Sequence, residues 1–128
     1  IVASLVGSEM CIRDRSTIFP NNDLNYDDRI LNKLKKYSLS SKLIVVVDLN
    51  RPAILTEVEK LSNGLIGVFG VFDEIVLEVI FGDFNPIGKL PFDIPSSMKE
   101  VNEQFSDVPD DTKNPIFKYG HGLSYLKE

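Results

Sequence analysis

The chain has 128 residues, of which 43% are hydrophobic and 26% charged, and its formal net charge is -5 at pH 7. This length and composition indicate one globular domain, or a piece of a larger protein. The acidic balance argues against a nucleic-acid partner, and no apolar run approaches the ~20 residues of a membrane span, so we expect neither nucleic acid nor membrane as a partner.

The first fifteen residues, IVASLVGSEMCIRDR, are best explained at the level of codons. Residues 5–15 match, without a gap, the translation of the end of a transposase-type sequencing adapter, and residues 1–4 would be index bases read as codons. We therefore expect residues 1–15 to be an assembly artefact outside the fold. Cys11, the only cysteine, falls in this segment and carries no information about redox compartment, metal or nucleophile. On this hypothesis the native N-terminus is missing, and the cellular compartment stays open.

Residues 16–128 begin with a polar loop that leads into a predicted helix. Asp27 or Asp28 can cap this helix, and apolar residues follow at helical spacing from Ile30 to Tyr37. Residues 42–50, KLIVVVDLN, form a continuous apolar run rich in β-branched residues. That pattern is typical of a strand buried on both faces.

A second strand follows after a short helical turn. Pro52 cannot donate to a strand ladder, so the first strand ends near it. Thr56, with Glu59 three residues later, predicts a capping box at the start of a short helix. Residues 64–70, GLIGVFG, read as the second buried strand.

A second long helix and an ordered coil complete the pattern. Asp73 is expected to cap a helix over residues 74–81, and Gly82 is expected to end it. A short helical segment is predicted over residues 96–103. The alternation of helices and buried strands predicts an α/β fold with a mainly parallel sheet flanked by helices.

Residues 81–95, FGDFNPIGKLPFDIP, fit no regular element. Three prolines and two glycines are too many for a helix interior or a central strand. The segment is also too apolar for an ordinary exposed loop. It therefore predicts an ordered coil that packs against the core.

Three motifs together resemble the C-terminal domain of glycoside hydrolase family 3. They are RPAIL after a buried strand, FGDFNPIGKLPFDIP, and YGHGLSY near the end of the chain. The resemblance spans roughly residues 28–125, and the family includes β-glucosidases, β-xylosidases and related exo-acting enzymes. It implies that residues 16–128 are part of an α/β sandwich domain that follows a (β/α)8 barrel, and that this barrel is missing here.

In that setting the segment 81–95 has an expected structural role. Leu90 and Phe92 should anchor it in the core, and the side chain of Asn85 should satisfy loop backbone groups. Gly88 is the expected turn residue, with a positive φ. Lys89 is expected to reach an acidic partner.

The resemblance does not transfer a catalytic residue to this chain. A retaining glycosidase needs two carboxyl groups ~5–5.5 Å apart, a nucleophile and a general acid/base. In the family the nucleophile is an aspartate on the barrel, in a Ser-Asp-Trp-like stretch, and this chain has no tryptophan. The family acid/base is a glutamate on a loop upstream of the Arg-Pro strand. That place holds Asp23, Asp27 and Asp28, of which Asp27 and Asp28 read as capping and first-turn charges, and Glu9 belongs to the adapter segment.

His121 and Arg51 could each have a functional role, but a structural role is the favoured interpretation for both. His121 lies between two glycines with no partner base or second metal ligand in sequence, which favours a hydrogen-bonded structural role. Arg51 follows the end of a strand, where α/β proteins place their sites, but an ion pair with Asp48, Asp73 or a barrel acid is favoured.

Neither a metal nor a cofactor is expected. The three aspartates of the tail have nothing opposite them that would complete a calcium cage. The glycines of the second strand do not open a helix in a phosphate-binding pattern. The aspartates are Asp107, Asp110 and Asp111, and the glycines are Gly64, Gly67 and Gly70.

Two functions remain. The first is the C-terminal part of an exo-acting retaining β-glycosidase, with β-glucosidase as the best-fitting activity, which completes a site for a β-linked glycoside or oligosaccharide beside the barrel. The second is a non-catalytic α/β module that braces a partner domain. Substrate-binding residues cannot be named from the sequence.

Overall fold

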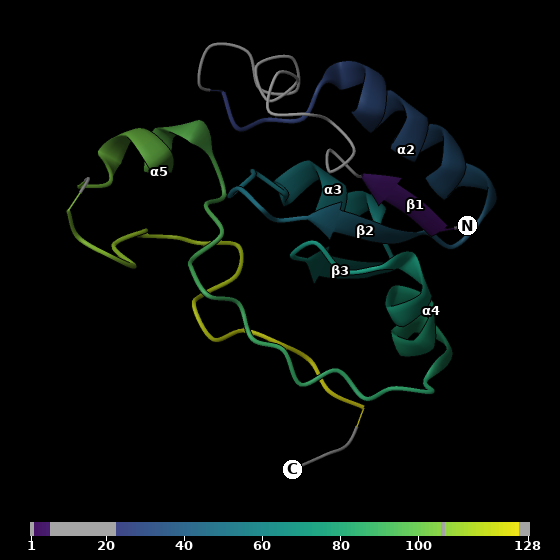
Figure 1. Cartoon of the computed structure of the whole chain (residues 1–128). Helices are drawn as coiled ribbons and strands as arrows, with labels where there is room; N and C mark the ends of the chain where they lie inside the picture. The colour runs from purple at the N-terminus through teal and green to yellow at the C-terminus, as the bar shows by residue number, and fades with distance from the viewer. Residues whose placement is uncertain (1, 6–22, 106, 126–128) are drawn as a thin grey trace.

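A computed structural model describes residues 2–5, 23–105 and 107–125 of the chain (Figure 1). The described residues form a three-stranded parallel sheet and four helices, which confirms the α/β prediction. In chain order the elements are β1 (Val2–Leu5), α2 (Asp28–Ser40), β2 (Ile44–Asp48), α3 (Thr56–Leu61), β3 (Gly64–Val68), α4 (Asp73–Phe81) and α5 (Met98–Glu103).

The sheet has the order β1-β2-β3, so β2 is its central strand. In register, Val45 of β2 lies opposite Leu65 of β3. Val45 and Val47 are fully buried, as the apolar run predicted for a strand covered on both faces. Helices α2 and α3 contact each other, and α4 lies at the far side of the sheet from α2 (Figure 1).

Strand β1 comes from the segment that we attribute to an adapter. Val2–Leu5 pair in parallel with the first four residues of β2. The arrangement differs from the expectation that residues 1–15 lie outside the fold. It has a simple physical basis, because strand pairing uses main-chain groups and an open strand edge accepts a short extended segment of almost any sequence. The adapter origin stays a hypothesis, and residues 6–15 lie outside the described part.

The helix starts confirm one predicted cap and correct another. Asp27 is the N-cap of α2, and its side chain accepts a hydrogen bond from the Arg29 amide at 2.8 Å. The capping box predicted for α3 is wrong, because Leu55 is the N-cap and no side chain bonds there. The Thr56 hydroxyl instead donates to the carbonyl oxygen of Ser96 at 2.7 Å. A residue forty positions away therefore binds the hydroxyl that the capping-box pattern had placed at the helix start.

The ends of α4 lie close to the predicted ones. Phe72 is the N-cap and Asp73 the first helical residue, so the predicted cap is displaced by one position. Gly82 ends the helix in the left-handed region at φ 84°, as predicted.

The core lies between the sheet and α2 and α3. Its fully buried members include Leu34 of α2, Val45 of β2 and Val58 of α3. Ile94 is also fully buried, although it lies in the coil after α4. The coil therefore belongs to the core, as its apolar character predicted.

The coil after α4 pairs with the tail of the chain. Residues 88–94 and 116–122 run antiparallel, and we call this pair of segments the loop ribbon (Figure 1). Leu90 donates its amide to His121 and accepts one from Gly120, both at 2.9 Å. Ile94 and Phe117 form an isolated antiparallel bridge. The sequence did not predict this pairing.

Within the loop ribbon, the roles predicted for the residues of segment 81–95 can be compared with their observed contacts. Leu90 and Phe92 are half-buried and pack against the core, as expected. Asn85 accepts the Tyr125 amide at 2.8 Å, which confirms its bond to a loop backbone group.

Two expectations for this segment are wrong. Gly88 does not have a positive φ, and in the loop ribbon the glycine with a positive φ is Gly120 instead. The Lys89 ammonium donates to the carbonyl oxygen of Gly122 at 3.1 Å, so its observed partner is backbone and not an acid.

Candidate functional site

The carboxyl ends of the parallel strands form the candidate site, because open α/β sheets bind their ligands at this edge. β2 ends at Asp48 and β3 at Val68, and the amide of Leu49 donates to the carbonyl of Val68 at 2.8 Å. The Asp48 carboxylate accepts the Asn50 amide at 3.0 Å. This turn carries the chain to Arg51, which is half-buried.

The segment before α2 lies at the same edge. The amide of Ile54 donates to the carbonyl of Leu24 at 3.0 Å, so residues 23–27 lie beside the turn that carries Arg51. The motif resemblance led us to expect an acid/base in this upstream place, which here contains aspartates. Asp23 accepts the amide and side-chain nitrogen of Asn25, and Asp27 caps α2. Both carboxylates thus have local structural partners, which the sequence had indicated for Asp27.

Tyr26 is a half-buried phenol at this edge. Burial, and secondarily the negative charge of Asp48, raises the pKa of Tyr26 to about 12. The hydroxyl therefore stays protonated at neutral pH and remains a hydrogen-bond donor. Its ring packs against the core.

A groove of about 770 Å³ lies between β3 and the loop ribbon. Its walls are mostly apolar, with Leu65 of β3 on one side and Leu90 and Tyr125 on the other. Two of its polar side chains already serve the fold: Asn63 accepts the Leu43 amide at 2.9 Å, and Lys89 holds Gly122. The groove could therefore contact a ligand mainly through apolar side chains.

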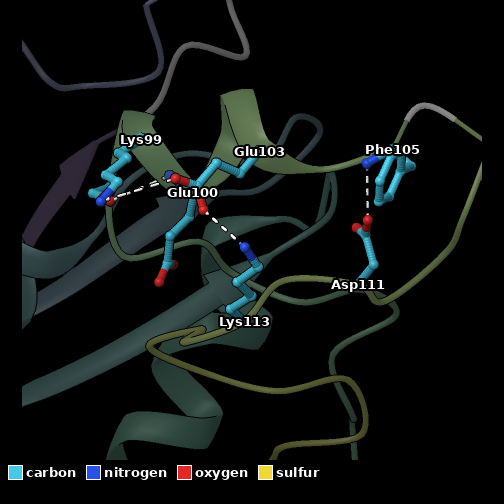
Figure 2. Close-up of polar contacts among 7 residues, drawn as sticks. Lys99, Glu100, Glu103, Phe105, Asp111 and Lys113 are labelled. Carbon is cyan, nitrogen blue, oxygen red and sulfur yellow. Dashed lines mark hydrogen bonds and ion pairs between the residues drawn. The ribbon is translucent and has the colours of Figure 1, made fainter.

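His121 has the structural role that the sequence favoured. Its ring stacks on Phe117 with centroids 5.0 Å apart, and its backbone oxygen accepts the Leu90 amide in the loop ribbon. Within the described residues no three His, Cys, Asp or Glu side chains gather as a metal site. Asp111 of the tail accepts the Phe105 amide at 2.8 Å (Figure 2).

A polar cluster around α5 was not predicted. Glu103 lies between Lys113 at 3.1 Å and Lys99 at 3.9 Å (Figure 2). Burial raises the pKa of Glu100, but hydrogen bonds from Ser96 and Asn114 outweigh that effect and lower it. These contacts join α5 to the tail, and exposed ion pairs of this kind contribute little to stability. Oppositely charged residues ten positions apart give no local sequence signal.

The polar groups that lie at this edge are Arg51 and the Asp48 turn. Retaining hydrolysis would in addition need a nucleophile and an acid/base at close range. The carboxylates of Asp23, Asp27 and Asp48 each accept a local amide, so no catalytic residue is assigned to them.

The sequence matches the family described as the glycosyl hydrolase family 3 C-terminal domain over residues 4–125, and the chain belongs to this family. The resemblance drawn from the three motifs is thereby confirmed. Among characterised relatives, "Beta-glucosidase C" of Emericella nidulans is 44% identical over 95 residues, which cover 73% of this chain and 15% of the relative. The "Periplasmic beta-glucosidase/beta-xylosidase" of Dickeya chrysanthemi is 34% identical over 110 residues, covering 86% of this chain and 16% of the relative.

Solved structures support the fold. The crystal structure of a β-glucosidase from Listeria innocua in complex with glucose has a TM-score of 0.67 and 16% identity, over 80% of this chain and 17% of that chain. The chain thus spans about a sixth of the length of these proteins. None of the helices in the described ranges is long and apolar enough to cross a membrane.

Proposed function

We propose that the chain is the C-terminal part of an exo-acting retaining β-glycosidase, with β-glucosidase as the best-fitting activity. The observation that carries the proposal is the family match over residues 4–125, together with relatives named as β-glucosidases. The substrate would be a β-linked glycoside or oligosaccharide. The mechanism uses carboxylates and water, so it calls for no cofactor.

In this proposal the domain completes a sugar site whose nucleophile comes from the preceding (β/α)8 barrel. The carboxyl edge of the sheet would face that barrel, because Arg51 and the segment before α2 lie together there. A guanidinium at this edge can donate paired hydrogen bonds to sugar hydroxyls or to a barrel carboxylate. Arg51 would then be a positioning residue.

The alternative is a bracing module that supports a partner domain and contributes nothing to the site. It is favoured by one observation, that Asp23, Asp27 and Asp48 are each engaged in local hydrogen bonds. A bracing role predicts effects on stability alone.

Two assays test the proposal. The purified chain should hydrolyse no aryl β-glucoside, because at least one of the two carboxylates is absent from it. A chimaera in which this chain replaces the matching C-terminal part of the Emericella nidulans relative should hydrolyse aryl β-glucosides with retention of the anomeric configuration. A folded but inactive chimaera would contradict the proposal, as would clear turnover by the purified chain.

An arginine pair separates the two functions. In the chimaera, Arg51→Ala should raise KM or lower kcat, whereas Arg29→Ala, at an exposed position on α2, should leave both unchanged. If Arg51→Ala lowers only the melting temperature, the bracing function is the correct one.

A further inference from the structure

Asn63 and Gly64 form the only asparagine-glycine pair of the sequence, and they connect α3 to β3. An asparagine in this position can lose ammonia spontaneously, because the backbone nitrogen of a following glycine reaches the side-chain amide carbon without hindrance from a Cβ atom. Asn63 is exposed and lines the groove between β3 and the loop ribbon, so water has access to it. The pair therefore has the chemistry and the solvent access that this reaction needs.

Three hydrogen bonds to Leu43 hold the pair in place. The Leu43 amide donates to Oδ1 of Asn63 at 2.9 Å. In return, the amides of Asn63 and Gly64 donate to the carbonyl oxygen of Leu43 at 2.7 and 3.3 Å. Leu43 itself is fully buried, so its position is fixed by the core. Cyclisation needs the Asn63 side chain to turn onto a Gly64 nitrogen that has given up its hydrogen, and the folded arrangement engages both groups elsewhere.

We propose that the Asn63-Gly64 pair is a self-modification site that the sheet keeps unreactive and that reacts when β3 separates locally from β2. The Gly64 nitrogen gives its proton to water and attacks Cγ of Asn63, forming an N–Cγ bond while the Cγ–Nδ2 bond breaks. The departing nitrogen takes up a proton and leaves as ammonia. Water then opens the cyclic imide at either of its carbonyl carbons, which leaves aspartate or isoaspartate at position 63. Water is the co-reactant throughout, and the site does not depend on the glycosidase function.

Strand β3 is well placed to open in this way. It is an edge strand in the order β1-β2-β3, and its residues are half-buried or exposed, whereas the middle residues of β2 are buried. Gly64 pairs with Ile44 at the first position of the β2–β3 register, so fraying from this end of the strand releases Asn63 first. Local openings of this kind need less free energy than global unfolding.

The two products differ in their effect on the sheet. Aspartate keeps an oxygen where Oδ1 of Asn63 accepts the Leu43 amide. Isoaspartate carries the main chain through its side chain and so adds a carbon between position 63 and the Gly64 nitrogen. The added carbon shifts β3 against Ile44 and withdraws the acceptor of the amide of buried Leu43, and an unmet buried donor is destabilising. Isoaspartate therefore makes the opening of β3 irreversible.

Rates of modification in the folded and unfolded chain test the proposal. The 128-residue chain is incubated at one mildly alkaline pH in buffer, in urea below its unfolding midpoint and in urea above it, and peptide mapping by mass spectrometry measures both products at position 63. Modification should be at least about tenfold slower in buffer than in the unfolded chain, which corresponds to an opening free energy of ~1.4 kcal/mol or more. In dilute urea the rate should rise less steeply than the unfolded population, because a local opening exposes less surface.

Asn25 is the internal control, because it is exposed and precedes tyrosine. It should react far more slowly than Asn63 in the unfolded chain. Equal rates at Asn63 in buffer and in unfolding urea would overturn the proposal. A rate in dilute urea that rises in parallel with global unfolding would overturn it as well, since β3 would then not open locally.

Two variants test the attacking group and the irreversible step. A Cβ atom on Gly64 would lie 3.5 Å from Cγ1 of Ile44, an ordinary contact, so Gly64→Ala should fold like the parent and, once unfolded, be modified severalfold more slowly. An unchanged rate would exclude the Gly64 nitrogen as the attacking group. Asn63→Asp should melt in urea like the parent, whereas the isoaspartyl chain, separated by chromatography and refolded, should melt at lower urea. Equal midpoints for these two chains would overturn the irreversible step.

Discussion

Gly122 lies close to the main chain of Gly88 in the loop ribbon, and replacing it is a sharp test of that arrangement. A Cβ atom on Gly122 would lie 2.2 Å from the carbonyl oxygen of Gly88. The two segments would have to separate by about 1 Å to restore an ordinary C···O contact. That movement would weaken the bonds from Lys89 to Gly122 at 3.1 Å and from Leu90 to His121 at 2.9 Å.

The expected loss for Gly122→Ala follows from these contacts. Forced overpacking costs about 1–3 kcal/mol, and each weakened hydrogen bond adds up to about 0.5–1.5 kcal/mol. We expect the free energy of unfolding to fall by about 2–4 kcal/mol in urea melts at constant pH.

Gly88→Ala is the matched control for this change. Nothing lies within 4 Å of a Cβ added there, and its φ is not positive. It should leave stability unchanged or raise it by up to ~1 kcal/mol, because alanine restricts the unfolded chain. The reasoning fails if Gly122→Ala stays within ~0.5 kcal/mol of the parent, or if Gly88→Ala is the more destabilising of the two.

Three further predictions concern the core, pH and the first residues. Ile94→Ala should lower the free energy of unfolding by about 2–5 kcal/mol, which is more than Phe92→Ala at a half-buried site. Lys89→Ala should cost at most ~1 kcal/mol in the same urea melts. If Lys89→Ala were the most destabilising of the three, a charged contact of Lys89 would hold the segment in place. Because burial raises the pKa of Tyr26 from 10.0 to about 12, the unfolded state loses this proton first and stability should decline between those two pH values. The total decline is about 3 kcal/mol, and Tyr26→Phe should remove it. Deleting residues 1–15 should change stability by less than ~1 kcal/mol if they derive from an adapter, and a larger loss would show that β1 is native.

Elements whose signal is local were predictable. The run KLIVVVDLN gave the buried central strand, because continuous β-branched residues suit a strand covered on both faces. Asp27 and Gly82 marked a helix start and a helix end through bonds and dihedral angles that involve near neighbours only. The family resemblance rests on motifs in sequence and needed no coordinates.

Contacts between distant residues were not predictable. The Thr56 hydroxyl bonds Ser96, forty positions away, and so the capping box failed. Lys89 meets a backbone oxygen of Gly122, because the tail pairs with the coil after α4. For the site, the sequence located Arg51 at the end of a strand, but only the bond between Ile54 and Leu24 placed the aspartate segment beside it.

The sequence by itself determined the α/β class and the family, because these depend on residue types and their spacing. The tertiary structure decided which glycine is constrained by space, which residue of the coil is the buried anchor, and which apolar side chains stay outside. Gly122 and Gly88 look alike in sequence, yet only at Gly122 would an added Cβ meet another backbone. Phe81 and Val76 occupy one apolar helix, yet only Val76 reaches the core, since burial depends on where the helix packs and not on the residue alone.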